Sequence, residues 1–255
     1  MTWSRSRVRP TPRPGAAASP DAEEAELTMG KQRPALADVM AAVGVAALYR
    51  RHVAPWMYTW GARPDEVRAT LPGDELVAPD ACRTTRAVTI DAPRRDVWAW
   101  LVQLGEGRGG FYSYSLLERA VGADIHNADE IRPEWQRLDV GDTIWLARRY
   151  GPAASQVVAA VEPASHLVLV SPADYARLQR AELASGCWSF VLRREQNWTR
   201  LLVRGSGRPV GHFWFDIPHF VMEQKMMRGI AARAQRTRRS QVVDAIRTEH
   251  PAGVG

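Results

Sequence analysis

The stretch TTRAVTIDAPRRDVWAWLVQLG, residues 84–105, decides the fold. Five of its first seven residues are β-branched, which favours an extended strand. Pro93 then stands in the first turn of a predicted helix, where the N–H that it lacks would have no partner. Apolar residues recur at helical spacing from there to Leu104, and Gly105 ends the pattern. The stretch therefore predicts a strand followed at once by an amphipathic helix.

Five short apolar segments lie further along the chain and predict the rest of a sheet. They are TIWLAR (143–148), SQVVAAVE (155–162), HLVLVS (166–171), CWSFVLRR (187–194) and TRLLVRGS (199–206). Turn-forming residues separate them, so consecutive strands should pair antiparallel. In the last segment Leu201 and Val203 alternate with Arg200 and Arg204, which predicts a sheet with one sheltered face.

The segment DIPHFVMEQKMMRGIAARAQR, residues 216–236, predicts one long helix that closes the domain. Asp216 suits the N-cap of this helix, and apolar side chains recur along one stripe from Met222 to Ala234. The element order is therefore a strand, two helices, a run of antiparallel strands and a long helix. A curved sheet wrapped around the last helix would enclose a cavity, so we expect an α+β fold with a cavity between the sheet and this helix.

The loop RGGFYSYSLLE, residues 108–118, follows the first helix and combines a Gly pair with three aromatic rings. Ser115 and Glu118 have the spacing of a capping box, which predicts a short helix starting near Leu116. The glycines match neither a P-loop nor a dinucleotide-binding pattern, so we interpret them as a close-packed turn, with phosphate binding as the minor alternative. This turn would carry the aromatic rings toward the mouth of the cavity.

A polar cluster follows this loop at His126, Asn127, Asp129 and Glu130. His126 and Asp129 have the chemistry of a general base and the carboxylate that orients it. Two alternatives stay open: a loop held by its own side-chain hydrogen bonds, and a metal site, although no second His follows at helical ligand spacing. We predict no metal and no cofactor.

Composition divides the chain into four segments. We predict a disordered arm (1–34), an apolar helix and strap (35–80), the main domain (81–236) and a basic tail (237–255). The apolar window VMAAVGVAALY, residues 39–49, is shorter than the roughly 20 residues that span a bilayer. It therefore predicts a buried or interfacial helix.

The formal net charge is +6, and much of the excess lies in Arg residues near the two termini. These Arg clusters lack interleaved aromatic residues and any nucleic-acid-binding motif, so we predict no specific nucleic-acid partner. Cys82 and Cys187 show no paired metal spacing, which favours a reduced, cytoplasmic protein. Peripheral contact with a membrane through residues 39–60 is an alternative. The oligomeric state stays open.

The element order and the run TRAVTIDAPRRDVWAWLVQLGEGRGGFYSYSLLERAVGADIHNADEIRPEWQRLDVGD resemble the helix-grip superfamily called SRPBCC. This superfamily includes START-like lipid carriers and polyketide cyclase/dehydrase-like proteins. The lead-in from Trp60 to Leu76, with WGA and LPGDEL, resembles a bacterial branch of uncharacterised members of the superfamily. The resemblance covers residues 56–236, and it implies a helix-grip fold and a cavity without an established reaction.

We therefore predict a domain that binds a hydrophobic or amphipathic small molecule, lipid or polyketide-like, between the sheet and the C-terminal helix. An enzyme of the cyclase, dehydratase or hydrolase type, with His126 as general acid/base and Asp129 orienting it, is the alternative. Docking on a membrane or a partner through residues 39–60 is a third. The predicted ligand-binding residues are Trp100, Arg108, Tyr112, Tyr114, Trp188, Phe190, Phe220, Met222 and Met226.

Overall fold

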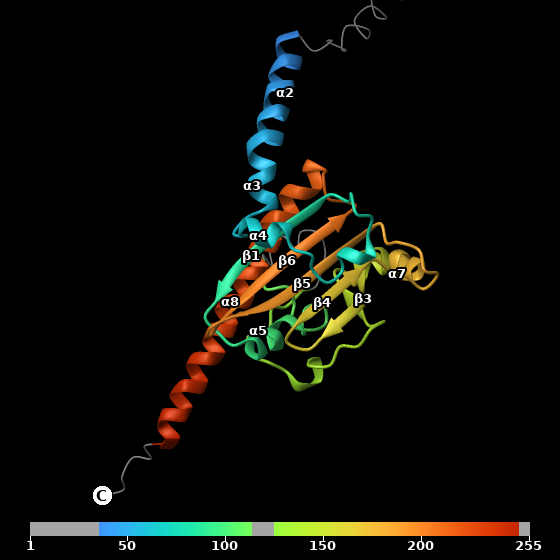
Figure 1. Cartoon of the computed structure of the whole chain (residues 1–255). Coiled ribbons are helices and arrows are strands. Elements are labelled where there is room, and N and C mark those ends of the chain that lie inside the picture. Colours follow the sequence, from blue (N-terminus) through green and yellow to red (C-terminus); the bar gives the residue numbers. More distant parts are fainter. Residues whose placement is uncertain (1–35, 114–124, 250–255) are drawn as a thin grey trace, which may run out of the picture. The chain divides into compact units, whose positions relative to one another are not determined.

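The computed structural model describes residues 36–113 and 125–249 (Figure 1). The chain forms two compact units, Met1–Leu48 and Tyr49–Gly255. Helix α2 (Leu36–Leu48) is the described part of the first unit. The second unit holds the sheet and also most of the segment predicted as a strap. The short helix predicted near Leu116 lies outside the described residues.

A six-stranded antiparallel sheet forms the centre of the second unit, with strand order β1-β6-β5-β4-β3-β2. Its strands are β1 (Arg83–Ile90), β2 (Thr143–Trp145), β3 (Ser155–Glu162), β4 (His166–Val170), β5 (Gly186–Glu195) and β6 (Trp198–Gly207). The first strand pairs with the last one, from Arg83 opposite Ser206 to Ile90 opposite Thr199. All six predicted strands are present, although β2 is shorter than the predicted segment 143–148.

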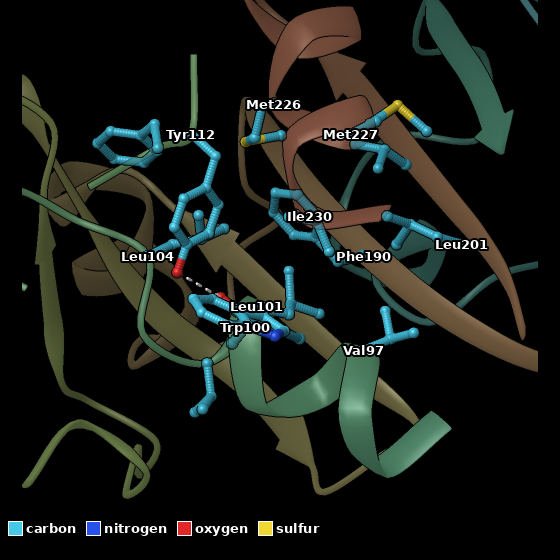
Figure 2. Close-up of a cluster of buried hydrophobic side chains, with 14 of the residues drawn as sticks. Val97, Trp100, Leu101, Leu104, Tyr112, Phe190, Leu201, Met226, Met227 and Ile230 are labelled. Atoms are coloured by element: carbon cyan, nitrogen blue, oxygen red, sulfur yellow. Dashed lines mark hydrogen bonds between the residues drawn. The ribbon is translucent and has the colours of Figure 1, made fainter. Parts of the chain in front are cut away.

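Helices α5 (Arg94–Leu101) and α8 (Phe213–Glu249) pack against the strands and enclose the main core. In Figure 1, α8 runs behind the strands. One cluster of buried side chains includes Val97 and Leu101 of α5 and Met226 and Ile230 of α8 (Figure 2), and all four are almost fully buried. This arrangement confirms the predicted α+β helix-grip fold.

Helix α8 is longer than the sequence pattern predicted. It begins three residues before Asp216 and continues to Glu249, through most of the segment predicted as a basic tail. The Asp216 carboxylate accepts a hydrogen bond from the Gly211 N–H at 3.3 Å, and another from the Tyr58 hydroxyl at 2.5 Å. The predicted capping residue therefore joins the start of α8 to the preceding turn and to the strap.

Short helices connect the main elements. They are η1 (Tyr49–Val53), α3 (Ala54–Tyr58), α4 (Pro64–Arg68), η2 (Asp74–Leu76), η3 (Pro133–Trp135), η4 (Arg148–Ala154) and α7 (Pro172–Leu178). Helix α4 starts with Pro64, and the Glu66 carboxylate accepts a hydrogen bond from the backbone N–H of Arg63 at 2.7 Å. This contact stabilises the first turn of α4 and fixes the position of Glu66.

The prediction of a single sheltered face is wrong, because the strap covers the other face of the sheet. Arg200 and Arg204 on β6 are 7% and 2% exposed. The Arg200 guanidinium donates to both carboxylate oxygens of Glu66, at 2.7 and 2.8 Å. That of Arg204 donates to Asp74 at 2.5 Å and to the Ala69 carbonyl at 2.8 Å. The alternation that suggests exposed arginines therefore comes from buried ion pairs between the sheet and the strap.

Candidate functional site

A cavity of about 570 Å³ lies between the sheet and the first turns of α8. This volume is within the range of natural small-molecule sites, which is about 300 to 1,000 Å³. Its wall comes from the ends of β5 and β6, the turn that follows β6, η4 and α8. All of these elements belong to the second unit, so the fold of that unit alone forms the cavity.

Apolar side chains make up most of the exposed wall of the cavity. Three of the nine predicted ligand-binding residues line it: Trp188 of β5, and Met222 and Met226 of α8. Phe111 lies at the wall as well, on the Gly-rich loop that was predicted to reach the cavity mouth. A rigid aromatic ring and two flexible thioethers give a wall that can adjust to the shape of an apolar ligand.

One residue of the cavity wall belongs to a buried ion pair that the sequence did not reveal. Glu223 of α8 lines the cavity, and its carboxylate accepts a hydrogen bond from Arg86 of β1. Both side chains are 1% exposed. The indole N–H of Trp188 donates to the other oxygen of Glu223 at 2.7 Å, and the Arg86 Nε donates to the carbonyl of Met57 at 2.7 Å. The charges of the pair cancel, so this part of the wall is polar but neutral overall.

His219 lies one helical turn before Glu223 and also lines the cavity. Its ring stacks on Phe215 with 4.9 Å between the centroids, and it meets the edge of Trp188 at 5.8 Å. The Nδ1 atom lies 3.4 Å from Nη1 of Arg86. Burial lowers the pKa of His219, and the nearby Arg86 charge adds to this effect although Glu223 opposes it. The imidazole is therefore neutral at neutral pH.

Three predicted ligand-binding residues lie in the core and do not line the cavity. Trp100, Tyr112 and Phe190 are at most 3% exposed and belong to the main hydrophobic cluster. In Figure 2 the Tyr112 hydroxyl points at Trp100, where it donates to the backbone carbonyl at 3.1 Å. It also accepts from the side-chain amide of Gln103 at 3.0 Å. Burial raises the pKa of Tyr112 to about 12, which keeps the phenol protonated.

Two further predicted residues, Arg108 and Phe220, also lie away from the cavity wall. The Arg108 guanidinium donates to the backbone carbonyls of Val102 and Trp135, at 3.1 and 2.6 Å. Phe220 faces the strap, where its ring lies 5.2 Å from that of Trp56. Arg108 therefore holds two loops together, and Phe220 holds α8 against the strap. The remaining predicted ligand residue, Tyr114, is outside the described residues.

The predicted catalytic pair lies outside the cavity. His126 is exposed and does not line it. Asp129 has a side chain that is 73% exposed and accepts a hydrogen bond from Arg233 of α8 at 3.0 Å. The Arg233 Nε also donates to the Ala128 carbonyl at 2.8 Å, so this arginine fastens the loop after residue 125 to the helix.

His219 and Glu223 are the functional candidates that sequence reasoning missed. Their spacing of four residues on one helix places them on the same side, and Met222 and Met226 of the predicted stripe lie beside them. That spacing was a usable signal for His219 and Glu223. Arg86 carries no such signal, because its partner lies 137 residues away.

The described residues contain no cluster of three His, Cys, Asp or Glu side chains that could hold a metal ion. Among the helices of residues 36–113 and 125–249, none has both the length and the apolar character needed to cross a membrane.

No protein-family model and no curated protein matches this sequence. Among solved structures, protein SSP2350 from Staphylococcus saprophyticus is 12% identical, with a TM-score of 0.38, over 59% of this chain and 89% of that chain. CalU16 from Micromonospora echinospora is 16% identical, with a TM-score of 0.29, over 61% of this chain and 85% of that chain. DynU16, from the dynemicin biosynthetic locus, is 14% identical, with a TM-score of 0.31, over 57% of this chain and 46% of that chain.

These likenesses are too distant to carry an argument about function, and the fold rests on the elements of this chain itself. A six-stranded antiparallel sheet holds one long C-terminal helix, and α5 follows the first strand. The chain therefore has the helix-grip fold that its resemblance to the SRPBCC superfamily implies.

Proposed function

We propose that this protein binds a hydrophobic or amphipathic small molecule, lipid or polyketide-like, in the cavity between the sheet and α8. The observation that carries the proposal is a ligand-sized cavity whose exposed wall is mostly apolar and includes Trp188, Met222 and Met226. Burying an apolar ligand against such a wall contributes about 25 cal/mol per Å² of area removed from water. The buried Arg86–Glu223 pair and His219 add a polar region that would orient the ligand.

Filling the cavity tests this proposal. Met222→Trp places a larger side chain in the space that the ligand would occupy. Val221→Trp is the matched control, because Val221 lies next to Met222 on α8 but is 39% exposed and does not line the cavity. The measurement is the affinity for the uncharged fluorescent probe N-phenyl-1-naphthylamine, with circular dichroism as the check on folding. We expect Met222→Trp to weaken binding at least about tenfold, or about 1.4 kcal/mol, and the control to change it little.

Equal probe affinity in the wild type and folded Met222→Trp would show that the probe binds elsewhere, and the assignment of this cavity would fail. Native mass spectrometry of the freshly purified protein gives independent information. A co-purifying compound of lipid or polyketide-like mass that is lost in Met222→Trp and kept in Val221→Trp would identify the ligand class directly.

The enzymatic alternative at His126 stays a prediction. His126 is exposed and outside the cavity, so the cavity gives this alternative no support. It predicts that His126→Ala abolishes turnover of a substrate without weakening its binding.

Contact with an anionic membrane surface through residues 39–60 is a second candidate function, and exposed apolar residues favour it. Val45 and Leu48 of α2 are 69% and 60% exposed, and the exposed Arg50 and Arg51 follow directly. An exposed apolar helix that is followed in the sequence by cationic side chains is suited to the interface of a bilayer with anionic lipids. Substituting both arginines by Glu should reduce sedimentation with phosphatidylserine-containing vesicles. Sedimentation equal to that of the wild type would count against membrane contact through this segment.

A further inference from the structure

We propose that the cavity selects uncharged ligands that carry a hydroxyl group, an alcohol or a phenol, and holds this hydroxyl between the imidazole of His219 and the carboxylate of Glu223. This inference rests on the proposed function and names the chemical class of the ligand. It comes from the positions of the donors and acceptors along one part of the cavity wall.

The Arg86 guanidinium fixes which nitrogen of His219 carries the proton. Nδ1 of His219 lies 3.4 Å from Nη1 of Arg86. A guanidinium can only donate hydrogen bonds, so Nδ1 must act as the acceptor in this contact. The ring is neutral, because burial lowers the pKa of His219. Its single N–H is therefore at Nε2, where it serves as a donor in the cavity wall.

The Glu223 carboxylate keeps acceptor capacity after its own contacts are made. One oxygen accepts from Arg86 and the other from the Trp188 indole at 2.7 Å. An ionised carboxylate has about four lone-pair sites, so two such contacts leave room for a further donor. Arg86 is the counterion of Glu223, and both side chains are only 1% exposed. The wall therefore presents a strong acceptor beside the His219 donor.

The gap between this donor and this acceptor fits one oxygen atom. Nε2 of His219 lies 3.9 Å from Oε1 of Glu223, which is too far for a direct hydrogen bond. Two hydrogen bonds of about 2.7 to 2.8 Å that meet at one oxygen at about 90 to 110° span about 3.8 to 4.6 Å. A hydroxyl group can accept from the Nε2–H and donate its own proton to Glu223. It is thus the ligand group that satisfies both sides at once.

Other polar groups satisfy this site less well. A ketone or an ether accepts from His219 but gives Glu223 no donor. A carboxylate would be repelled by Glu223, whose charge is already matched by Arg86. An ammonium group would bring a second positive charge to a pair that is already neutral. The order of affinity for ligands with the same apolar body should therefore be hydroxyl first, ether second and carboxylate last.

Three naphthalene derivatives of nearly equal size test this order. The probes are 2-naphthol, 2-methoxynaphthalene and 2-naphthoate, each used to displace N-phenyl-1-naphthylamine from the full chain at pH 7.5. We expect 2-naphthol to bind at least about tenfold more tightly than 2-methoxynaphthalene, and 2-naphthoate to bind most weakly. Equal affinity for the first two, with the fluorescent probe still bound, overturns the inference and leaves the proposed function standing. Tightest binding by 2-naphthoate also overturns it.

A variant of His219 locates the effect. His219→Phe keeps an aromatic ring that can stack on Phe215 but removes the Nε2–H. His212→Phe is the matched control, since His212 is exposed and does not line the cavity. The affinities for 2-naphthol and 2-methoxynaphthalene should both fall in His219→Phe alone, because each ligand oxygen loses the Nε2–H donor. An unchanged affinity for 2-naphthol in His219→Phe overturns the inference. Loss of fluorescent-probe binding by the wild type itself would instead overturn the proposed function.

Discussion

The ion pair between Glu66 of α4 and Arg200 of β6 should contribute strongly to the stability of the fold. The Glu66 side chain is fully buried and that of Arg200 is 8% exposed. Burial alone would raise the pKa of Glu66, but the hydrogen bonds from Arg200 and the Arg63 backbone outweigh it and lower the pKa from 4.5 to about 2. Such a change corresponds to about 3 kcal/mol in favour of the charged carboxylate.

Glu66→Gln keeps the size of the side chain and removes its charge, which leaves the Arg200 guanidinium buried without a counterion. Removing one partner of a buried pair costs about 3 to 5 kcal/mol. Glu182→Gln is the matched control, because Arg180 and Glu182 are 58% and 45% exposed, and exposed pairs contribute about 0 to 1 kcal/mol. Urea unfolding followed by Trp fluorescence measures both. With a urea slope of about 3 kcal/mol per M, Glu66→Gln should lower the midpoint by about 1 to 2 M.

The pH dependence gives an independent check on the same pair. Because the folded pKa of Glu66 lies below its ordinary value, its contribution is complete above about pH 4.5 and is lost as the pH falls toward 2. The difference in unfolding free energy between the wild type and Glu66→Gln should therefore be constant near pH 7 and shrink over this acidic range. A difference below about 1 kcal/mol at pH 7, or one that does not change with pH, would refute the reasoning.

Two further substitutions test how the core is held together. Tyr112→Phe leaves the Trp100 carbonyl without the hydrogen bond from the hydroxyl, and it should lower the unfolding free energy by about 1 to 3 kcal/mol in urea unfolding; an unchanged midpoint would contradict this. Gly229→Ala should destabilise the protein by about 1 to 3 kcal/mol, because the new Cβ would lie 2.5 Å from the Tyr112 carbonyl oxygen. Gly44→Ala is its control: nothing lies within 4 Å of the added Cβ, so helicity by circular dichroism should rise or stay the same. If the two Gly substitutions changed the unfolding free energy equally, the close approach of the new Cβ to Tyr112 at residue 229 would not be the cause of the destabilisation.

The fold was predictable to the extent that local pattern and hydrophobic period determine it. Residues 84–105 predicted β1 and α5, and alternating segments predicted the other strands, because a buried element has to repeat its apolar residues with its own period. The start and end of α8 were predicted less well. The start was placed at Asp216 because Asp is a common N-cap residue, although Phe213, Trp214 and Phe215 already belong to the helix, and the basic last turns lack the apolar stripe that marks its middle.

The site was predictable only in part, for a reason that Trp188 and Phe190 illustrate. The two residues are neighbours on one side of β5, and the sequence gives both the same apolar and aromatic character. Trp188 lines the cavity, whereas Phe190 is fully buried in the core. Which of them faces the cavity depends on where α8 crosses the sheet. The spacing of apolar residues in the sequence does not specify where that crossing lies.

The sequence by itself determined the order of the elements, the antiparallel sheet, the closing helix and the existence of an apolar interior. Only the tertiary structure decided which charged side chains meet inside it. Arg86 and Glu223 are 137 residues apart, and Glu66 and Arg200 are 134 apart. Local propensity acts over a few neighbouring residues, whereas a buried charge is tolerated only where the folded chain brings its partner within hydrogen-bond distance. The pairing of Glu223 with Arg86, together with the neutral His219 beside it, gives the cavity its polar wall.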